Sequence, residues 1–257
     1  MNIPFYFFLR LTIFLLLTLA LLPLQFIIVF FIKNCIYIIP YFYHKLCRRI
    51  FGIKIKTFGK ISINSPILLI SNHASYLDII ILGSLFKTSF VAKKEVAKWP
   101  LFGILAKLQN TIFVDRRISS LKSQENQIIE HLNKKNNLVI FPEGTSSDGN
   151  KVLPFKSSLF NIFEENLDSK IFVQTITIVY KKINGIYLNR TDRKDITWHS
   201  NMDFVPNIFN VLKKFSIEVE VIFNKEFIPN KKWNRKKIAL QCWEKINYNL
   251  INSLYRK

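Results

Sequence analysis

Residues 67–78 have the sequence Ile-Leu-Leu-Ile-Ser-Asn-His-Ala-Ser-Tyr-Leu-Asp, which joins an apolar run to a polar loop. The run at 67–70 is typical of a buried strand, and residues 75–86 have the spacing of a helix. Ser75 is expected to cap that helix, which places Asp78 in its first turn. A buried strand followed at once by a helix is typical of α/β proteins.

The same alternation continues along the rest of the chain. Apolar runs of strand length occur at residues 90–92, 111–114, 137–141, 171–180 and 217–223, and helical patterns occur at 101–108, 119–135 and 155–166. This order predicts an α/β domain with a mostly parallel central sheet flanked by helices. No linker rich in Pro, Gly or Ser divides it, so we expect residues 61–257 to form a single domain.

An apolar run precedes this domain at residues 11–32. As a helix it would be about 33 Å long, roughly the thickness of the hydrocarbon core of a bilayer. Pro23 and Gln25 interrupt the run, and a second apolar stretch follows at 37–43. The sequence is therefore consistent both with a transmembrane helix and with a helical hairpin held in one leaflet.

Charge indicates how this N-terminal segment is oriented. Arg10 is the first charged residue, whereas seven basic residues follow the apolar run: Lys33, Lys45, Arg48, Arg49, Lys54, Lys56 and Lys60. Positive charge gathers on the cytoplasmic side of membranes and is attracted to anionic headgroups. We therefore expect residues 1–60 to anchor the protein at the inner, cytoplasmic membrane, with the domain facing the cytoplasm.

The whole chain is strongly basic. Its 257 residues contain 37 Lys and Arg against 17 Asp and Glu, a formal net charge of +20. This excess predicts an anionic partner, either membrane lipid or nucleic acid. Residues 231–257 predict an amphipathic basic helix that either packs on the domain or contacts the membrane. Cys35, Cys47 and Cys242 have no metal-ligand spacing, so we expect no metal site.

His73 and Asp78 are the first candidates for catalysis. A histidine just outside a helix can fold back onto an aspartate in its first turn, and the carboxylate would then fix the imidazole tautomer. The second ring nitrogen would be free to accept a proton from a hydroxyl. The alternative is that Asp78 is simply a favourable acid near a helix N-terminus. We expect His44, His131 and His199 to be surface or packing residues.

A second polar loop follows the apolar run at 137–141. It begins with Glu143, Gly144 and Thr145 and continues Ser-Ser-Asp-Gly. Glycine allows close approach of the backbone to a ligand, and successive N–H groups in a turn bind anions. An ordinary β-turn explains the same residues equally well.

Basic residues end two other predicted strands. Lys93 follows the strand at 90–92, and Arg116 follows the strand at 111–114. At the same edge of the sheet as His73, Arg would offer a bidentate phosphate contact and Lys a point charge. Both side chains are equally consistent with solvated surface charge.

Four short motifs occur in order along the chain: Asn72-His73-x4-Asp78, Lys93-x-Glu95, Phe113-Val-Asp115-Arg116 and Phe141-Pro-Glu-Gly-Thr145. Together they resemble the motif set of the 1-acyl-sn-glycerol-3-phosphate acyltransferase family, over about residues 60–225. The segments 141–158 and 198–203 are also similar to a bacterial branch that includes lyso-ornithine-lipid acyltransferases. A serine hydrolase is disfavoured, because the sequence has no Gly-x-Ser-x-Gly motif.

The resemblance implies acyl transfer at a membrane, from acyl-CoA or acyl carrier protein to the free hydroxyl of a lysophospholipid, without a covalent intermediate or a cofactor. The expected acceptor is 1-acyl-sn-glycerol-3-phosphate, which gives phosphatidic acid; a lyso-ornithine lipid or another lysolipid is the alternative. A basic lipid- or nucleic-acid-binding membrane protein without catalysis is the competing class. Nucleic acid is not expected as a partner, because no DNA- or RNA-binding signature occurs.

The resemblance also implies roles for single residues. His73 would be the general base and Asp78 its orienting partner, with Lys93 or loop N–H groups stabilising the oxyanion. The glycerol phosphate would be held by the side chain of Arg116 and by the loop of Glu143, Gly144 and Thr145.

The sequence departs from the family at Ser146, where the family often has Arg. A phosphate ligand would then be missing, or replaced by Lys151 or Lys156. This departure concerns the acceptor headgroup rather than the reaction.

Overall fold

A computed structural model describes residues 4–64, 66–115, 121–165, 171–199, 202–230 and 232–256. Within these residues eight strands form a sheet in the order β1-β8-β6-β2-β5-β3-β4, with β7 paired to β6. The strands are β1 (Ile53–Phe58), β2 (Ile67–Ser71), β3 (Ser89–Lys93), β4 (Ile112–Val114), β5 (Leu138–Ile140), β6 (Phe172–Ile183), β7 (Ile186–Tyr187) and β8 (Ile217–Phe223).

The centre of the sheet is parallel. β2 lies between β5 and β6 and runs parallel to both, and the parallel arrangement continues through β3 to β4. β8 runs antiparallel to β6, and β1 runs parallel to β8. The predicted mostly parallel sheet is therefore confirmed. The carboxyl ends of β2 to β6 lie at one edge, where α/β proteins bind their ligands.

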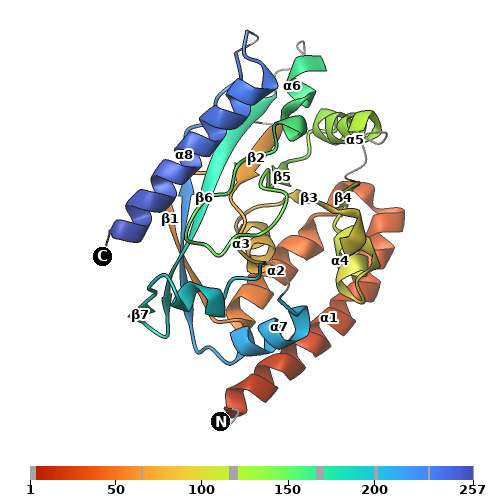
Figure 1. Cartoon of the computed structure of the whole chain (residues 1–257). Coiled ribbons are helices and arrows are strands. Elements are labelled where there is room, and N and C mark those ends of the chain that lie inside the picture. Colours follow the sequence, from red (N-terminus) through yellow and green to blue (C-terminus); the bar gives the residue numbers. More distant parts are fainter. Residues whose placement is uncertain are drawn as a thin grey trace.

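Helices cover both faces of this sheet (Figure 1). They are α1 (Phe5–Phe31), α2 (Ile38–Ile50), α3 (Leu77–Leu85), α4 (Phe102–Leu108), α5 (Leu121–Asn133), α6 (Ile162–Glu165), α7 (Phe204–Leu212) and α8 (Arg235–Tyr255). Short 3₁₀ helices are η1 (Lys33–Cys35), η2 (Lys94–Lys98), η4 (Ser157–Phe160) and η5 (Asp192–Asp195).

The four residues at 67–70 show how the two faces are built. Successive side chains of a strand point to opposite faces. Ile67 and Leu69 join the core under α1, α2, α3 and α7. Leu68 and Ile70 join the core under α5 and α8. All four are fully buried, which explains the continuous apolar run in place of an alternating one.

The N-terminal helix α1 is the described helix that is long and apolar enough to cross a membrane. It packs against α2, α4 and α7. Tyr6 near its start donates a hydrogen bond to the Lys213 carbonyl at 2.6 Å, and Gln25 near its end donates to the Leu108 carbonyl at 2.7 Å. Contacts with the domain therefore extend along most of the helix.

Several elements differ from the sequence-based expectation. β1 places residues 53–58 in the sheet, before the boundary expected near residue 60, and the division into 1–60 and 61–257 stays a prediction. The helix expected at 155–166 consists of η4 and α6, and α7 was not expected.

The Ser75 side chain accepts a hydrogen bond at the start of α3, as the predicted cap required. Tyr76 occupies the position before α3 and its own side chain makes no cap, but the hydroxyl of Ser75, one residue earlier, accepts from the Leu77 N–H at 3.4 Å. The Asp78 carboxylate in turn accepts from the N–H groups of two residues of the preceding loop, Ala74 and Ser75.

Candidate active site

The loop between β2 and α3 brings His73 and Asp78 together. His73 Nδ1 lies 2.8 Å from Asp78 Oδ2, which also accepts from the N–H groups of Ala74 at 2.7 Å and Ser75 at 3.0 Å. Because a carboxylate only accepts hydrogen bonds, Nδ1 carries the proton. Nε2 therefore has the free lone pair, on a ring that is partly exposed while Asp78 is buried.

The second oxygen of Asp78 is bound by a residue that the sequence did not single out. Tyr180 Oη, in the C-terminal half of β6, donates to Asp78 Oδ1 at 2.6 Å. Burial, followed by the Asp78 charge, raises the pKa of Tyr180 well above its ordinary value. The phenol therefore stays protonated and acts as a donor. In the sequence, Tyr180 lies in an apolar run 102 residues away, so spacing gave no signal of this contact.

Glu143 joins the His73 loop to the loop after β5. Its Oε1 accepts from the His73 N–H at 2.7 Å, and its Oε2 accepts from the Leu153 N–H at 2.8 Å. The side chain is buried, and this burial raises the pKa of Glu143 to about 8. Both oxygens thus contact protein backbone, and the expected role of Glu143 in holding an acceptor stays a prediction.

The His73 ring and backbone are fixed by neighbouring elements. The ring stacks on Phe141 with centroids 4.2 Å apart and an interplanar angle of 21°. The preceding residue, Asn72, exchanges two hydrogen bonds with the backbone of Ile178 in β6, at 2.9 and 2.8 Å. These contacts attach the loop that follows β2 to both neighbouring strands. Phe141 connects it to the end of β5, and Asn72 connects it to β6.

Two further segments, around Trp198 and around Ser147, also contact the backbone of the His73 loop. The Trp198 N–H donates to the Ala74 carbonyl at 2.9 Å, and the Ser147 N–H donates to the His73 carbonyl at 2.8 Å. Ser146 Oγ donates to the Trp198 carbonyl. Three segments far apart in the sequence therefore form the surroundings of His73.

The remaining residues of the second loop differ in their surroundings. Gly144 has φ +64, a backbone conformation that favours glycine, and the end of the Lys156 side chain would lie 2.6 Å from a Cβ there. Thr145 is exposed. Both lie beside the buried Glu143, and their expected contact with substrate stays a prediction.

The two expected phosphate-binding cations are placed differently. Lys93 is the last residue of β3, and β3 is separated from β2 by β5 alone, so Lys93 lies at the same edge of the sheet as the His73 loop. Arg116 lies outside the described residues. Among the other histidines, His44 is buried and hydrogen-bonds Gln109 through Nε2 at 3.0 Å.

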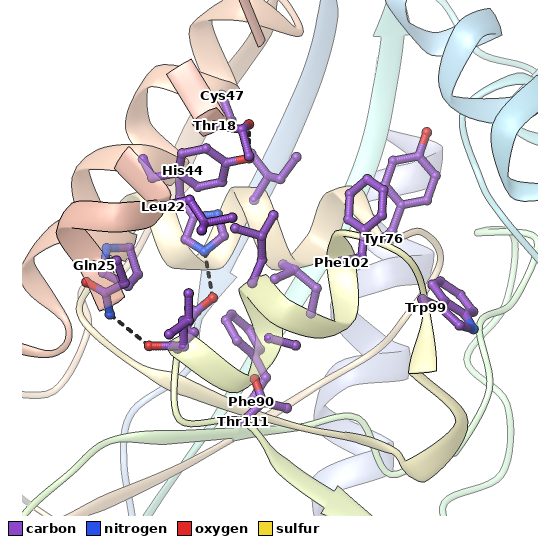
Figure 2. Close-up of a pocket in the computed structure, with 18 of the residues that line it drawn as sticks. Thr18, Leu22, Gln25, His44, Cys47, Tyr76, Phe90, Trp99, Phe102 and Thr111 are labelled. Carbon is purple, nitrogen blue, oxygen red and sulfur yellow. Dashed lines mark hydrogen bonds between the residues drawn. The ribbon is translucent and has the colours of Figure 1, made fainter. Parts of the chain in front are cut away.

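An apolar pocket lies between α1, α2, α3, α4 and α7 (Figure 2). It has an empty volume of about 1180 Å³, part of which opens to solvent. Phe90 and Tyr76 are in its wall. Phe90 stacks on Phe141 with centroids 6.3 Å apart, and Phe141 in turn stacks on His73. The pocket wall is thus two aromatic rings away from the candidate base.

Sequence reasoning missed this pocket, although α1 contained a signal of it. Phe14, Thr18, Leu21, Leu22 and Gln25 line the pocket and recur at helical spacing along one face of α1. Thr18 and Gln25 are buried, so these two polar residues of the apolar helix face the domain. No cluster of three or more potential metal ligands occurs within the described ranges.

Comparison with known proteins gives three findings. The family model described as Acyltransferase matches residues 52–181. A lyso-ornithine lipid O-acyltransferase of Brucella abortus is 35% identical over 243 residues, which cover 93% of this chain and 91% of that protein. A 1-acyl-sn-glycerol-3-phosphate acyltransferase of Neisseria gonorrhoeae is 29% identical over 131 residues, 51% of this chain and 50% of that protein.

The fold also matches a solved structure. The 1-acyl-sn-glycerophosphate acyltransferase PlsC from Thermotoga maritima superposes with a TM-score of 0.59, over 96% of this chain and 99% of that chain. The sequence identity is 18%, so this comparison shows the fold alone.

Proposed function

Because the chain belongs to the acyltransferase family, we propose that it transfers a fatty acyl group from acyl-CoA or acyl carrier protein to the free hydroxyl of a lysolipid. The observation that carries this proposal is the hydrogen-bonded pair of His73 and Asp78 at the carboxyl edge of the sheet, beside an apolar pocket. In a basic binding protein without catalysis, the hydrogen-bonded pair of His73 and Asp78 would have no function.

The geometry supports direct transfer by general base catalysis. His73 Nε2 takes the proton of the acceptor hydroxyl as the oxygen attacks the thioester carbonyl carbon. The tetrahedral intermediate then collapses, the carbon–sulfur bond breaks, and the leaving thiolate takes the proton back from the imidazolium. Asp78 stabilises that imidazolium through Nδ1. Lys93 or N–H groups of the loop at 144–146 stabilise the oxyanion.

We assign the apolar pocket to the acyl chain. Burial of each methylene contributes about 0.8 kcal/mol, so a pocket lined by aliphatic and aromatic side chains favours a long chain. Its wall at Phe90 and Tyr76 lies close to the His73 loop, which would place the thioester next to the base. The polar end of the donor would then remain outside the pocket.

For the acceptor, the relatives favour a lyso-ornithine lipid over 1-acyl-sn-glycerol-3-phosphate. The match to the Brucella abortus protein covers nearly the whole chain, whereas the match to the Neisseria gonorrhoeae protein covers half of it. Ser146 is consistent with this choice, because its hydroxyl donates to the Trp198 carbonyl and offers no positive charge to a phosphate. The phosphate acceptor, which the sequence motifs placed first, is the second candidate.

Asp148 supports the same choice. Its neighbour Ser147 contacts the His73 carbonyl, and a Cβ on its other neighbour, Gly149, would lie 3.7 Å from the Ala74 Cβ. Asp148 has no cation within 4 Å among the described residues, and Arg193, His199 and Lys151 act on its carboxylate at longer range. A carboxylate there would attract the ammonium group of an ornithine headgroup and repel a phosphate monoester.

We further propose that α1 and α2 lie in one leaflet of the cytoplasmic membrane. The contacts of α1 with the domain extend from Tyr6 to Gln25, about 28 Å of helix. A perpendicular crossing would therefore carry the domain into the bilayer. The exposed face of α1 is apolar, with Leu16, Leu19 and Phe30 each more than half exposed. The basic residues that follow α1 would meet anionic headgroups on the cytoplasmic side.

The test is a purified-enzyme assay that offers lyso-ornithine lipid and 1-acyl-sn-glycerol-3-phosphate in parallel, each with acyl-CoA and with acyl carrier protein as donor. We expect turnover that is absent in His73→Ala and highest with lyso-ornithine lipid. Asp148→Asn should reduce this preference, whereas Glu244→Gln, which removes an exposed carboxylate on α8, should not. Turnover confined to the phosphate acceptor would move the assignment to the second candidate, and no turnover with either would contradict the proposal.

A further inference from the structure

We infer that Tyr180 is a positioning residue for acyl transfer, whose hydroxyl orients Asp78 and sets the pH range in which His73 acts as a base. This inference rests on the proposed function, because it concerns the base of that reaction. Tyr180 belongs to β6, a strand that contributes none of the residues expected at the site. Its side chain is 1% exposed and cannot contact a substrate directly.

The hydrogen bonds around Asp78 show why a phenol is needed there. Asp78 is completely buried, and its Oδ2 accepts from three N–H groups of the His73 loop. Its Oδ1 faces β6, where Tyr180 donates to it at 2.6 Å. Tyr180 thus fixes the rotation of the carboxylate, and the carboxylate fixes the imidazole.

The same contact has an electrostatic consequence. A hydrogen bond donated to Oδ1 stabilises the negative charge of Asp78 and weakens its attraction for a protonated His73 ring. Removing the donor would strengthen that attraction, so the ring would become protonated at higher pH. The acid limb of the pH–rate profile, which reports loss of the free base, would then move to higher pH.

Other titratable groups face this pair and act in different pH ranges. Glu143, from the loop after β5, has its pKa raised to about 8, mainly by burial, so it changes charge on the alkaline side. Tyr76, before α3, has its pKa raised above its ordinary value by burial and stays neutral. A shift of the acid limb therefore distinguishes Tyr180 from these neighbours.

The first test is Tyr180→Phe in the full-length enzyme. We expect kcat to fall by about tenfold, the lower end of the loss typical for a supporting hydrogen bond. KM should stay unchanged, and the acid limb should move to higher pH. Tyr6→Phe is the matched control, because it removes a phenol that donates to the Lys213 carbonyl far from His73. A folded Tyr180→Phe enzyme with wild-type kcat and pH profile would overturn the inference.

A second measurement covers the case in which Tyr180→Phe does not fold. Replacement of Tyr180 by 3-fluorotyrosine keeps the ring and makes the phenol a stronger donor, so the acid limb should move to lower pH. The pH at which the His73 ring protonates should move the same way in NMR spectra of the resting protein, with His73→Ala identifying the signal. An unchanged His73 titration would reject the role of Tyr180. Absence of acyl transfer in the wild type would instead reject the proposed function.

Discussion

The loop that carries His73 and the helix α1 are held on the same domain by opposite kinds of contact. In the loop, buried polar groups bind one another, and Asp78 and Glu143 each accept hydrogen bonds on both oxygens. On α1, most large apolar side chains are exposed, while the polar residues Thr18 and Gln25 are buried against the domain. The His73 loop therefore has the hydrogen-bonded packing of a protein interior, whereas the exposed face of α1 is suited to the hydrocarbon region of a membrane.

This difference separates two properties of the enzyme. Hydrogen bonds are directional, so the loop fixes the orientation of the base to within the tolerance that catalysis needs. Apolar burial is non-directional and roughly proportional to area, so α1 determines where the protein resides rather than how the reaction proceeds. Changes in the loop should therefore lower kcat, and changes on the exposed face of α1 should lower membrane binding.

The largest effect is expected for His73→Ala. A positioned base contributes roughly 10²- to 10⁴-fold in rate, so kcat should fall by that factor while the variant still binds vesicles like the wild type. Single-turnover assays and vesicle flotation on the same preparation measure both properties. Near wild-type turnover in a folded variant would assign the chemistry to another residue.

Leu19→Lys tests the other region. Leu19 is 66% exposed on α1, and replacing it by a charged residue should weaken membrane partitioning by roughly 2 kcal/mol, about thirtyfold. Activity on detergent-solubilised acceptor should be unchanged, whereas activity on vesicles should fall. Equal binding of variant and wild type to anionic vesicles would show that this face does not meet lipid.

A point substitution is sharper here than removal of residues 1–60. That truncation would follow the domain boundary expected from the sequence, but it would also remove β1 from the sheet. It would take the buried Phe14 and Phe51 out of the core as well. Loss of activity after truncation would therefore report unfolding as much as loss of the membrane anchor.

Glu143→Gln tests whether hydrogen bonding alone positions the loop. The amide would present N–H donors to one of the two backbone N–H groups that Glu143 now binds, at His73 or at Leu153. We expect kcat to fall by about tenfold with little change in vesicle binding. If KM for the acceptor rose instead and kcat held, Glu143 would belong to the acceptor site, as the family resemblance implied.

The same substitution has a pH signature in stability. The pKa of Glu143 rises from 4.5 to about 8 in the folded protein, mainly through burial. Its contribution to stability is therefore full below about pH 4.5 and is lost as pH rises towards 8. Between these values the wild type should lose thermal stability relative to Glu143→Gln, as followed by calorimetry. Parallel curves for the two proteins would mean that the carboxyl is not desolvated.

Local patterns in the sequence predicted most of this architecture. The apolar run at 67–70, the helix after it and the His73–Asp78 loop all depend on neighbouring residues, and the structure has them close to the expected positions. β1 was missed because the exposed Lys54 and Lys56 alternate with Ile53 and Ile55 along this edge strand. In the sequence these lysines resemble the basic segment that follows a membrane helix.

Contacts between distant segments could not be predicted in the same way. Nothing near Tyr180 in the sequence indicates Asp78 as its partner, because the pairing of β2 with β6 brings the two together. The apolar pocket likewise could not be predicted, because its lining side chains come from five helices whose relative positions the sequence does not show. The C-terminal helix is an intermediate case: its pattern predicted a helix but left open whether packing or membrane contact explains it.

The smallest effect is expected for Tyr248→Lys on α8, the counterpart of Leu19→Lys on α1. Tyr248 is 67% exposed, so its exposure matches that of Leu19, but α8 covers the face of the sheet opposite to α1 (Figure 1). A flat membrane that meets α1 cannot also meet α8. Stability should change by no more than about 0.5 kcal/mol, and vesicle binding and kcat should match the wild type. A thirtyfold loss of vesicle binding would instead make α8 a membrane-contacting surface, and it would remove the distinction between the two long helices.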